Sequence, residues 1–124
     1  MNMQYIIGDD ITTIDLNFLY DIPGSDVEFI QLMIKTFIEN ISIVIEKMPG
    51  YFEKKDWDNL AKTAHFAKSS LSVIQIKQMV ELIKSIEVKS KTKNETNSLE
   101  EEIIQFKNQF ARAKVFLKNH ININ

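Results

Sequence analysis

Apolar residues recur every three or four positions along most of this sequence, and this spacing places them on one side of an α-helix. Four separate stretches show the pattern. Their apolar positions are Phe29, Met33, Phe37, Ile41, Val44 and Met48 in the first; Leu60, Ala64, Ala67, Leu71 and Ile74 in the second; Ile76, Met79, Val80, Ile83 and Ile86 in the third; and Ile103, Phe106, Phe110, Ala113 and Leu117 in the fourth. The sequence therefore predicts four substantial helices that each bury one face.

Residues that favour helix N-termini stand in front of these stretches. The predicted start signals are Ser25 with Glu28, Asp56 before Trp57, and Ser98 with Glu101. Ahead of them, Thr12 or Thr13 is expected to cap a short helix that carries Ile14, Leu16, Phe18 and Leu19. This short helix should stop before the breaker pair Pro23–Gly24.

Two further features modify the helical pattern. Pro49 lies inside the first long stretch, where its ring clashes with a carbonyl group and it donates no hydrogen bond. Because the apolar pattern continues at Tyr51 and Phe52, we expect the helix to bend at Pro49 and go on. Residues 89–97 contain no apolar side chain and are expected to form a solvated link before the last helix.

The predicted fold class is all-α, an antiparallel up-and-down four-helix bundle with an additional short N-terminal helix. We expect residues 1–124 to form a single domain, with its core at about 11–119. Three glycines and two prolines in 124 residues are too few for the many turns of an all-β protein or the loops of an α/β enzyme. The chain should thus be more than about two thirds helical and contain no sheet.

Charge and composition exclude several classes of function. The 15 basic and 17 acidic residues give a net charge of −2, so a nucleic-acid partner is not expected. The absence of cysteine removes disulfides, thiolate metal sites and cysteine nucleophiles. The N-terminus does not resemble a signal peptide, and no apolar run is long enough to span a membrane. We therefore expect a soluble, cytoplasmic protein that does not bind a membrane.

Neither a metal site nor a nucleotide site is expected. Metal-binding helical bundles place glutamate and histidine three positions apart, and neither His65 nor His120 has a carboxylate at three or four positions. No two glycines lie within ten residues of each other, so a glycine-rich phosphate loop is absent. We assign no cofactor, no metal ligand and no function to His120.

His65 is the best candidate for chemistry. On the helix that carries it, His65 points away from the predicted core face, beside Lys68 and Ser69. Ala61 and Ser72 extend this exposed stripe of small and polar residues by a turn in each direction. A neutral imidazole nitrogen can attack phosphorus, and a neighbouring ammonium can neutralise the charge that is added. An exposed histidine with a nearby lysine also arises by chance, so the spacing alone does not assign a function.

The segment Thr63-Ala64-His65-Phe66-Ala67-Lys68-Ser69-Ser70 resembles the signature of histidine-containing phosphotransfer (HPt) domains. The family pattern is Ala-His-x-x-Lys followed by small residues. Further similar features are Asp56-Trp57 before the histidine, and Leu19-Tyr20, Gly24-Ser25-Asp26, Phe29 and Phe37 in the opening helices. The resemblance covers residues from about 11 to 117 and implies the same helical-bundle fold.

The resemblance implies that His65 accepts a phosphoryl group and that Lys68 stabilises its charge. Ala61, Ser69 and Ser72 would form the stripe on which a receiver domain docks. The implied partners are the receiver domains of a hybrid histidine kinase and of a response regulator, and Mg²⁺ is expected only in the receiver. The chain would carry a phosphohistidine without ATP-dependent kinase activity of its own.

Three positions depart from the family pattern. Ser69 and Gln75 stand where glycine is common, and Ala67 stands where leucine is usual. Glutamine at position 75 would be strained if that position needs a positive φ.

Two other functions remain open on the sequence alone. One is a helical docking module that binds receivers or other signalling proteins without being phosphorylated, and the other is a structural subunit of a larger complex.

Overall fold

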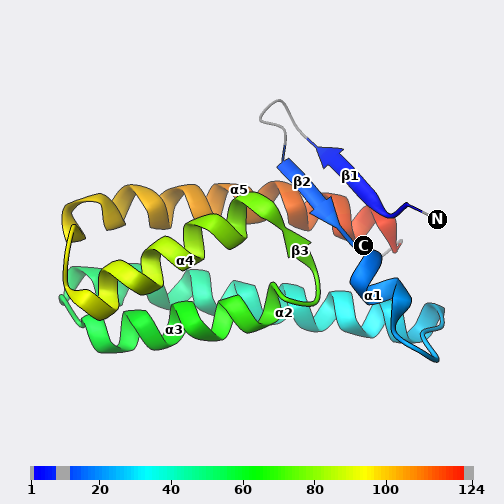
Figure 1. The fold of residues 1–124 in the computed structure, drawn as a ribbon, viewed down its shortest axis with the longest axis horizontal. Helices are drawn as coiled ribbons and strands as arrows, with labels where there is room; N and C mark the ends of the chain where they lie inside the picture. The colour runs from blue at the N-terminus through cyan, green and yellow to red at the C-terminus, as the bar shows by residue number, and fades with distance from the viewer. Residues whose placement is uncertain (1, 8–11, 122–124) are drawn as a thin grey trace.

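The computed structural model describes residues 2–7 and 12–121 of the chain. About 75% of these residues are helical, which confirms the predicted helix content. Four long helices lie side by side along the longest axis of the molecule (Figure 1). They are α2 (Val27–Glu53), α3 (Trp57–Ser70), α4 (Lys77–Thr92) and α5 (Leu99–His120). Both α2 and α4 pack against α3 and against α5, so the four helices enclose one apolar core.

The prediction of a chain without a sheet is wrong. Strands β1 (Gln4–Ile7), β2 (Thr12–Asp15) and β3 (Gln75–Ile76) form an antiparallel sheet in the order β1-β2-β3. This sheet lies over one end of the helices (Figure 1). In β2, Thr12 and Ile14 are buried whereas the alternate residues are half-exposed, which is the two-residue period of a strand. The hydroxyl group of Thr12 also donates to Gln109 Oε1 at 2.7 Å, which fixes β2 against α5.

The short N-terminal helix therefore starts later than predicted. Helix α1 (Asn17–Asp21) follows β2, and neither Thr12 nor Thr13 caps it. The β-branched Thr-Thr-Ile run of β2 favours extended backbone when a partner strand is available, and β1 supplies that partner. The end of α1 before Pro23–Gly24 is confirmed, and Gly24 adopts a positive φ of 81° in the turn.

Two of the three predicted N-caps are wrong in detail. Asp26, not Ser25, caps α2, because its carboxylate accepts from Phe29 N at 2.8 Å while Ser25 Oγ donates to the carbonyl of Tyr20. Asp56 caps α3 as predicted and accepts from Asn59 N at 3.3 Å. Ser98 precedes α5, but its hydroxyl bonds to Glu95 and Glu102 instead of capping the helix.

Helix α2 continues through Pro49 to Glu53, which confirms that this proline does not end the helix. Helix α4 is longer than expected and takes in the first four residues of the predicted 89–97 link. It ends where Lys93 adopts a left-handed conformation at φ 56°, and a 3₁₀ turn, η1 (Thr96–Ser98), leads into α5. The link between α4 and α5 is therefore only a few residues long.

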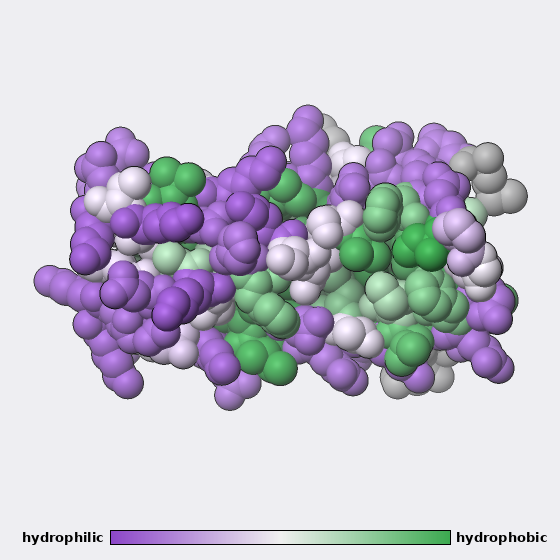
Figure 2. Space-filling model, turned by 60° about the horizontal axis from the view of Figure 1, so that its bottom comes forward, coloured by the Kyte–Doolittle hydropathy of each residue, from purple (hydrophilic) through white to green (hydrophobic). Residues whose placement is uncertain are grey.

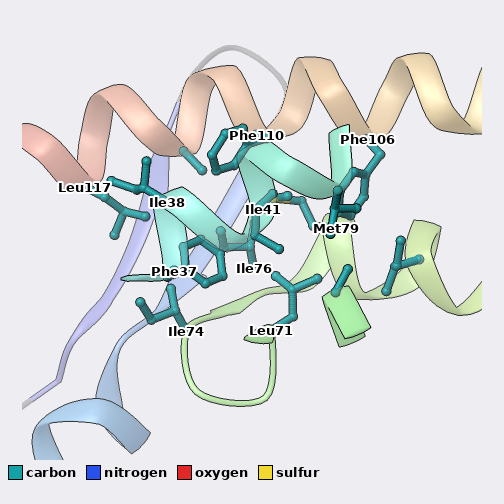
Figure 3. Packing of buried hydrophobic residues seen from close by; sticks show 14 of the residues in the cluster. Phe37, Ile38, Ile41, Leu71, Ile74, Ile76, Met79, Phe106, Phe110 and Leu117 are labelled. Carbon is teal, nitrogen blue, oxygen red and sulfur yellow. The ribbon is translucent and has the colours of Figure 1, made fainter. Parts of the chain in front are cut away.

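The apolar positions predicted for the four long stretches lie in or against one core, which also contains the unpredicted Ile30, Ile34 and Ile38 of α2 (Figure 3). Of these positions, Phe29, Met33 and Val80 are half-buried and the others are buried, whereas Phe18, expected on the short N-terminal helix, is 53% exposed. Ile11, where the core was expected to begin, lies outside the described residues. No helix in the described part of the chain combines the length and apolar composition needed to cross a membrane.

Candidate functional site

His65 lies near the middle of α3 on its outer side. The helix begins at the Asp56 cap and turns Leu60, Ala64 and Ala67 towards the core, so the imidazole must point away from it. The His65 side chain is 65% exposed, as the sequence predicted. Lys68, one turn further along α3, is 39% exposed and lies on the same side.

The structure adds a residue that the sequence analysis missed. Glu87 of α4 reaches across to α3 and binds both candidate side chains. Its Oε2 is 2.7 Å from His65 Nδ1, and its Oε1 accepts from Lys68 Nζ, also at 2.7 Å. The Glu87 side chain is only 8% exposed. One buried carboxylate therefore bridges the imidazole and the ammonium, with one oxygen for each.

A signal for Glu87 was present in the pattern of α4. Its position is four residues after Ile83 and three before Ser90, and all three residues are buried on the side of α4 that faces the other helices. A carboxylate on a buried helix face requires a partner, since an isolated buried charge is costly. Glu87 is 22 positions from His65 in the sequence, so the spacing of carboxylates around His65 does not indicate it.

The surroundings of Glu87 keep its carboxyl group ionised. The hydrogen bond from Lys68 is the largest cause that lowers its pKa below the usual 4.5, and the bond from His65 adds to it. Burial opposes this shift but does not outweigh it. Glu87 is therefore a hydrogen-bond acceptor at neutral pH.

This acceptor determines which imidazole nitrogen is reactive. An ionised carboxylate has no proton to donate, so the Nδ1–H of His65 must donate to it. A neutral His65 ring then carries its lone pair on Nε2. The site thus consists of a largely exposed imidazole whose nucleophilic nitrogen is selected by a buried carboxylate from a neighbouring helix.

A groove of about 780 Å³ lies beside His65. Its lining residues are Asp58, Ala61, Lys62, His65, Phe66, Ser69, Glu87 and Lys91. Of the predicted docking residues, Ser69 is exposed on this groove, but Ala61 is buried at 8% exposure. The expectation that Ala61 is exposed is wrong, because it lies one turn before His65 at the contact with α4. Its methyl group forms part of the groove without projecting from it.

Ser72 is exposed but lies on a second cavity, which has a volume of about 550 Å³ and extends from Lys68 towards β2 and β3. The serine hydroxyls are directed at the backbone. Ser69 Oγ donates to the carbonyl of His65 at 3.4 Å, and Ser72 Oγ donates to that of Ser69 at 2.6 Å. Both serines therefore stabilise the end of α3.

Gln75 does not need the glycine that its position suggested. It lies in strand β3, pairs with Asp15 of β2, and does not adopt a positive φ. The connection from α3 to α4 thus ends in extended backbone that any residue can adopt. The pairing with β2 replaces a glycine turn, and the sequence analysis did not foresee it because it expected no sheet.

His120 belongs to an aromatic cluster at the far end of α5. Its Nε2 and the Tyr20 hydroxyl group share a hydrogen bond of 2.7 Å, and its ring stacks on Phe116 with the centroids 5.8 Å apart. Burial lowers the His120 pKa. These contacts, together with the packing of Tyr5 on the same rings, join α1 and β1 to the C-terminal end of α5. The structure thus gives His120 a packing role.

Within residues 2–7 and 12–121, no group of three or more histidine, aspartate or glutamate side chains could hold a metal ion. Comparison of the sequence and the structure with protein-family models, curated proteins and solved structures found no match.

Proposed function

We propose that this chain is a phosphorelay intermediate, which accepts a phosphoryl group on Nε2 of His65 and passes it on. The observation that carries the proposal is the bond from His65 Nδ1 to the buried carboxylate of Glu87 at 2.7 Å, on a side chain that is otherwise 65% exposed. This arrangement supplies an oriented nucleophile at a surface that a second protein can reach. The resemblance of residues 63–70 to the HPt signature supports the same chemistry.

The proposed donor is an aspartyl phosphate on the receiver domain of a hybrid histidine kinase. The Nε2 lone pair attacks phosphorus, and the N–P bond forms as the P–O bond to the aspartate breaks. The aspartate carboxylate leaves with the bonding electron pair. The imidazolium that results keeps its proton on Nδ1, where Glu87 compensates the positive charge. Reversal of this step on a response regulator completes the relay.

Most of the catalytic apparatus would belong to the receiver, including its Mg²⁺ and the acidic residues that bind the ion. This chain contributes the position of the His65 imidazole and its Nδ1–H tautomer. Its own kinase activity is not part of the proposal. The proposal includes a cytoplasmic location for this chain, because it would exchange the phosphoryl group with cytoplasmic receiver domains.

The proposal also includes the arrangement of the four long helices. We interpret α2, α3, α4 and α5 as an antiparallel up-and-down four-helix bundle, to which α1 is added as the short N-terminal helix. Support comes from the cyclic packing of α2 on α3, α3 on α4, α4 on α5 and α5 on α2. The sheet is then an addition that covers one end of the bundle (Figure 1).

The docking surface is proposed to be the stripe of Ser69 and Ser72 beside His65, with Ala61 in the groove wall. Phe66 adjoins it and is 47% exposed. A third cavity, which lies between α2 and the end of α3, shares Ser69 with the His65 groove and includes Met33 and Val73. Figure 2 shows one face of the molecule. On it, apolar side chains gather over the half that holds α1 and the first half of α2. Such a surface is typical of a protein contact.

The test is phosphotransfer from purified receiver domains. Each receiver is phosphorylated with a small-molecule phosphodonor in Mg²⁺ and mixed with the wild-type chain, His65→Gln or His120→Gln. We expect acid-labile, alkali-stable phosphate on the wild type and on His120→Gln, and none on His65→Gln. Phosphate on His65→Gln would reject the assignment. A receiver that binds the wild type without labelling it would favour the docking module instead.

A further inference from the structure

The three lysines near His65 differ in what they touch. Lys68 is bound at 2.7 Å to Glu87 Oε1, whereas Lys62 and Lys91 line the groove that His65 also lines. We propose that Lys68 is a positioning residue that acts on His65 through Glu87, and that Lys62 and Lys91 meet the charge of the phosphoryl group. This inference rests on the proposed function, and it changes the role that the sequence resemblance gave to Lys68.

The position of Glu87 separates Lys68 from the reacting nitrogen. The two ring nitrogens of an imidazole point in different directions, and Nδ1 of His65 points at Glu87. A phosphoryl group on Nε2 therefore lies on the side of the ring that faces away from the carboxylate. The ammonium of Lys68 is held by that carboxylate, so a direct contact with the phosphoryl group would compete with this bond.

Lys68 has a clear effect through Glu87. Its hydrogen bond is the largest cause that lowers the pKa of this buried carboxyl group and so favours the ionised form. Without Lys68, the largely buried Glu87 carboxylate would have only the imidazole as its partner. A buried charge that loses a partner binds a proton more readily or rotates towards water. Either change weakens the acceptor for the Nδ1–H, and the ring is then free to exchange between its two tautomers.

Lys91 reaches the groove from the opposite wall. Helices α3 and α4 run in opposite directions, joined by residues 71–76 (Figure 1). Since Glu87 meets His65, Lys91 lies one turn further along α4 and beside Ala61, one turn back along α3. The small side chain of Ala61 leaves this part of the groove open. Lys62, three residues before His65, lines the same groove from α3.

The experiment measures two quantities on the same set of variants: the protonation of the two His65 ring nitrogens and the rate of phosphotransfer. Heteronuclear NMR of unphosphorylated protein reports which nitrogen of His65 carries the proton. Phosphotransfer from a Mg²⁺-loaded phosphorylated receiver gives the rate. The variants are Lys68→Ala, Lys68→Arg, Lys62→Ala, Lys91→Ala, Glu87→Gln and the double variant Lys68→Ala/Glu87→Gln. Lys84→Ala is the matched control, because it removes an exposed charge near Lys68 in the second cavity.

We expect Lys68→Ala to shift His65 from the Nδ1–H form towards a mixture of tautomers, and Lys68→Arg to keep the Nδ1–H form. Transfer should slow about tenfold in Lys68→Ala, the effect of one lost charge-assisted hydrogen bond. Adding Lys68→Ala to Glu87→Gln should slow transfer no further, since the two residues act as a unit. Lys62→Ala and Lys91→Ala should each slow transfer about threefold to tenfold, and the tautomer of His65 should stay the same. Lys84→Ala should change neither the tautomer of His65 nor the transfer rate.

Two results would overturn the inference. The His65 tautomer remaining unchanged in Lys68→Ala, or rate effects of Lys68 and Glu87 that multiply, would reject the role of Lys68 as a residue that acts through Glu87. Wild-type transfer rates in both Lys62→Ala and Lys91→Ala would reject the groove assignment. If no receiver labels the wild type, the proposed function and the groove assignment fail together. The NMR measurement still decides the role of Lys68 in that case.

Discussion

Replacing Glu87 with leucine should separate the stability of this protein from its activity. Glu87 occupies a buried position on α4, where an apolar residue of similar size fits the pattern set by Ile83. Its two partners are not buried with it, since the His65 and Lys68 side chains are 65% and 39% exposed. When Glu87 is removed, both partners can turn to water. No buried polar group is then left without a hydrogen bond.

The magnitude follows from two opposing contributions. Two charge-assisted hydrogen bonds are worth about 1.5 kcal/mol each when buried, and less here because both donors are partly solvated. Burying a leucine side chain contributes about 2 kcal/mol. Replacement of buried ionic groups by apolar ones of similar volume is often neutral or stabilising. We therefore expect Glu87→Leu to change the free energy of unfolding by less than about 1 kcal/mol, while phosphotransfer falls at least about tenfold.

The assay is urea unfolding followed by circular dichroism, together with phosphotransfer at matched concentrations of folded protein. Glu102→Leu is the control, because Glu102 of α5 is a largely buried carboxylate, 14% exposed, that is bound to Lys89 of α4 and not to the His65 site. Its partner Lys89 is only 22% exposed, so this variant should lose more stability yet keep its transfer rate. A loss of more than about 3 kcal/mol in Glu87→Leu would show that Glu87 is primarily structural. Unchanged transfer would refute its role in the site.

Three other perturbations give independent tests. Because the Glu87 pKa is lowered in the folded protein, its contribution to stability is present above the unfolded value of 4.5 and is lost as the pH falls through the folded value. Acid titration of Glu87→Gln should therefore show a weaker loss of stability than the wild type below this pH, and equal losses would contradict it. His120→Gln should leave transfer unchanged but lower the free energy of unfolding by about 1 kcal/mol, because it removes the hydrogen bond with Tyr20 and the ring stacking. Calorimetry checks this, and an unchanged melting temperature would show that the cluster contributes nothing. Pro49 is exposed within α2, so Pro49→Ala restores a helical hydrogen-bond donor without losing packing and should raise the free energy of unfolding by about 2 kcal/mol. Chemical denaturation measures this gain, and a lower midpoint would mean that the proline is required for the shape of α2.

The long helices were predictable because each has many apolar positions that agree with one another. A single ambiguous residue such as Pro49 could not outweigh the pattern on either side of it. The strands were not predictable in the same way. Each has four residues or fewer, and β2 becomes a strand only because β1 and β3 lie beside it. Such pairing depends on tertiary structure, which local spacing does not describe.

The candidate site shows the same limit. His65 and Lys68 lie on one helix, so their relation follows from helical geometry. Glu87 is separated from His65 by 22 positions and approaches it only because α4 folds back along α3. The burial of Ala61 has the same origin, since α4 covers that part of α3. The sequence could thus indicate the nucleophile, but not the carboxylate that orients it.

The most direct test of this orientation is to determine which atom of His65 carries the phosphoryl group. Phosphorus–nitrogen correlation NMR on the phosphorylated chain distinguishes the two ring nitrogens. With Nδ1–H bound to Glu87 at 2.7 Å, the phosphoryl group should be on Nε2 of His65, and the Nδ1 proton should remain in its hydrogen bond. A phosphoryl group on Nδ1, or phosphate at any residue other than His65, would contradict the assignment of Glu87 and His65 as a unit.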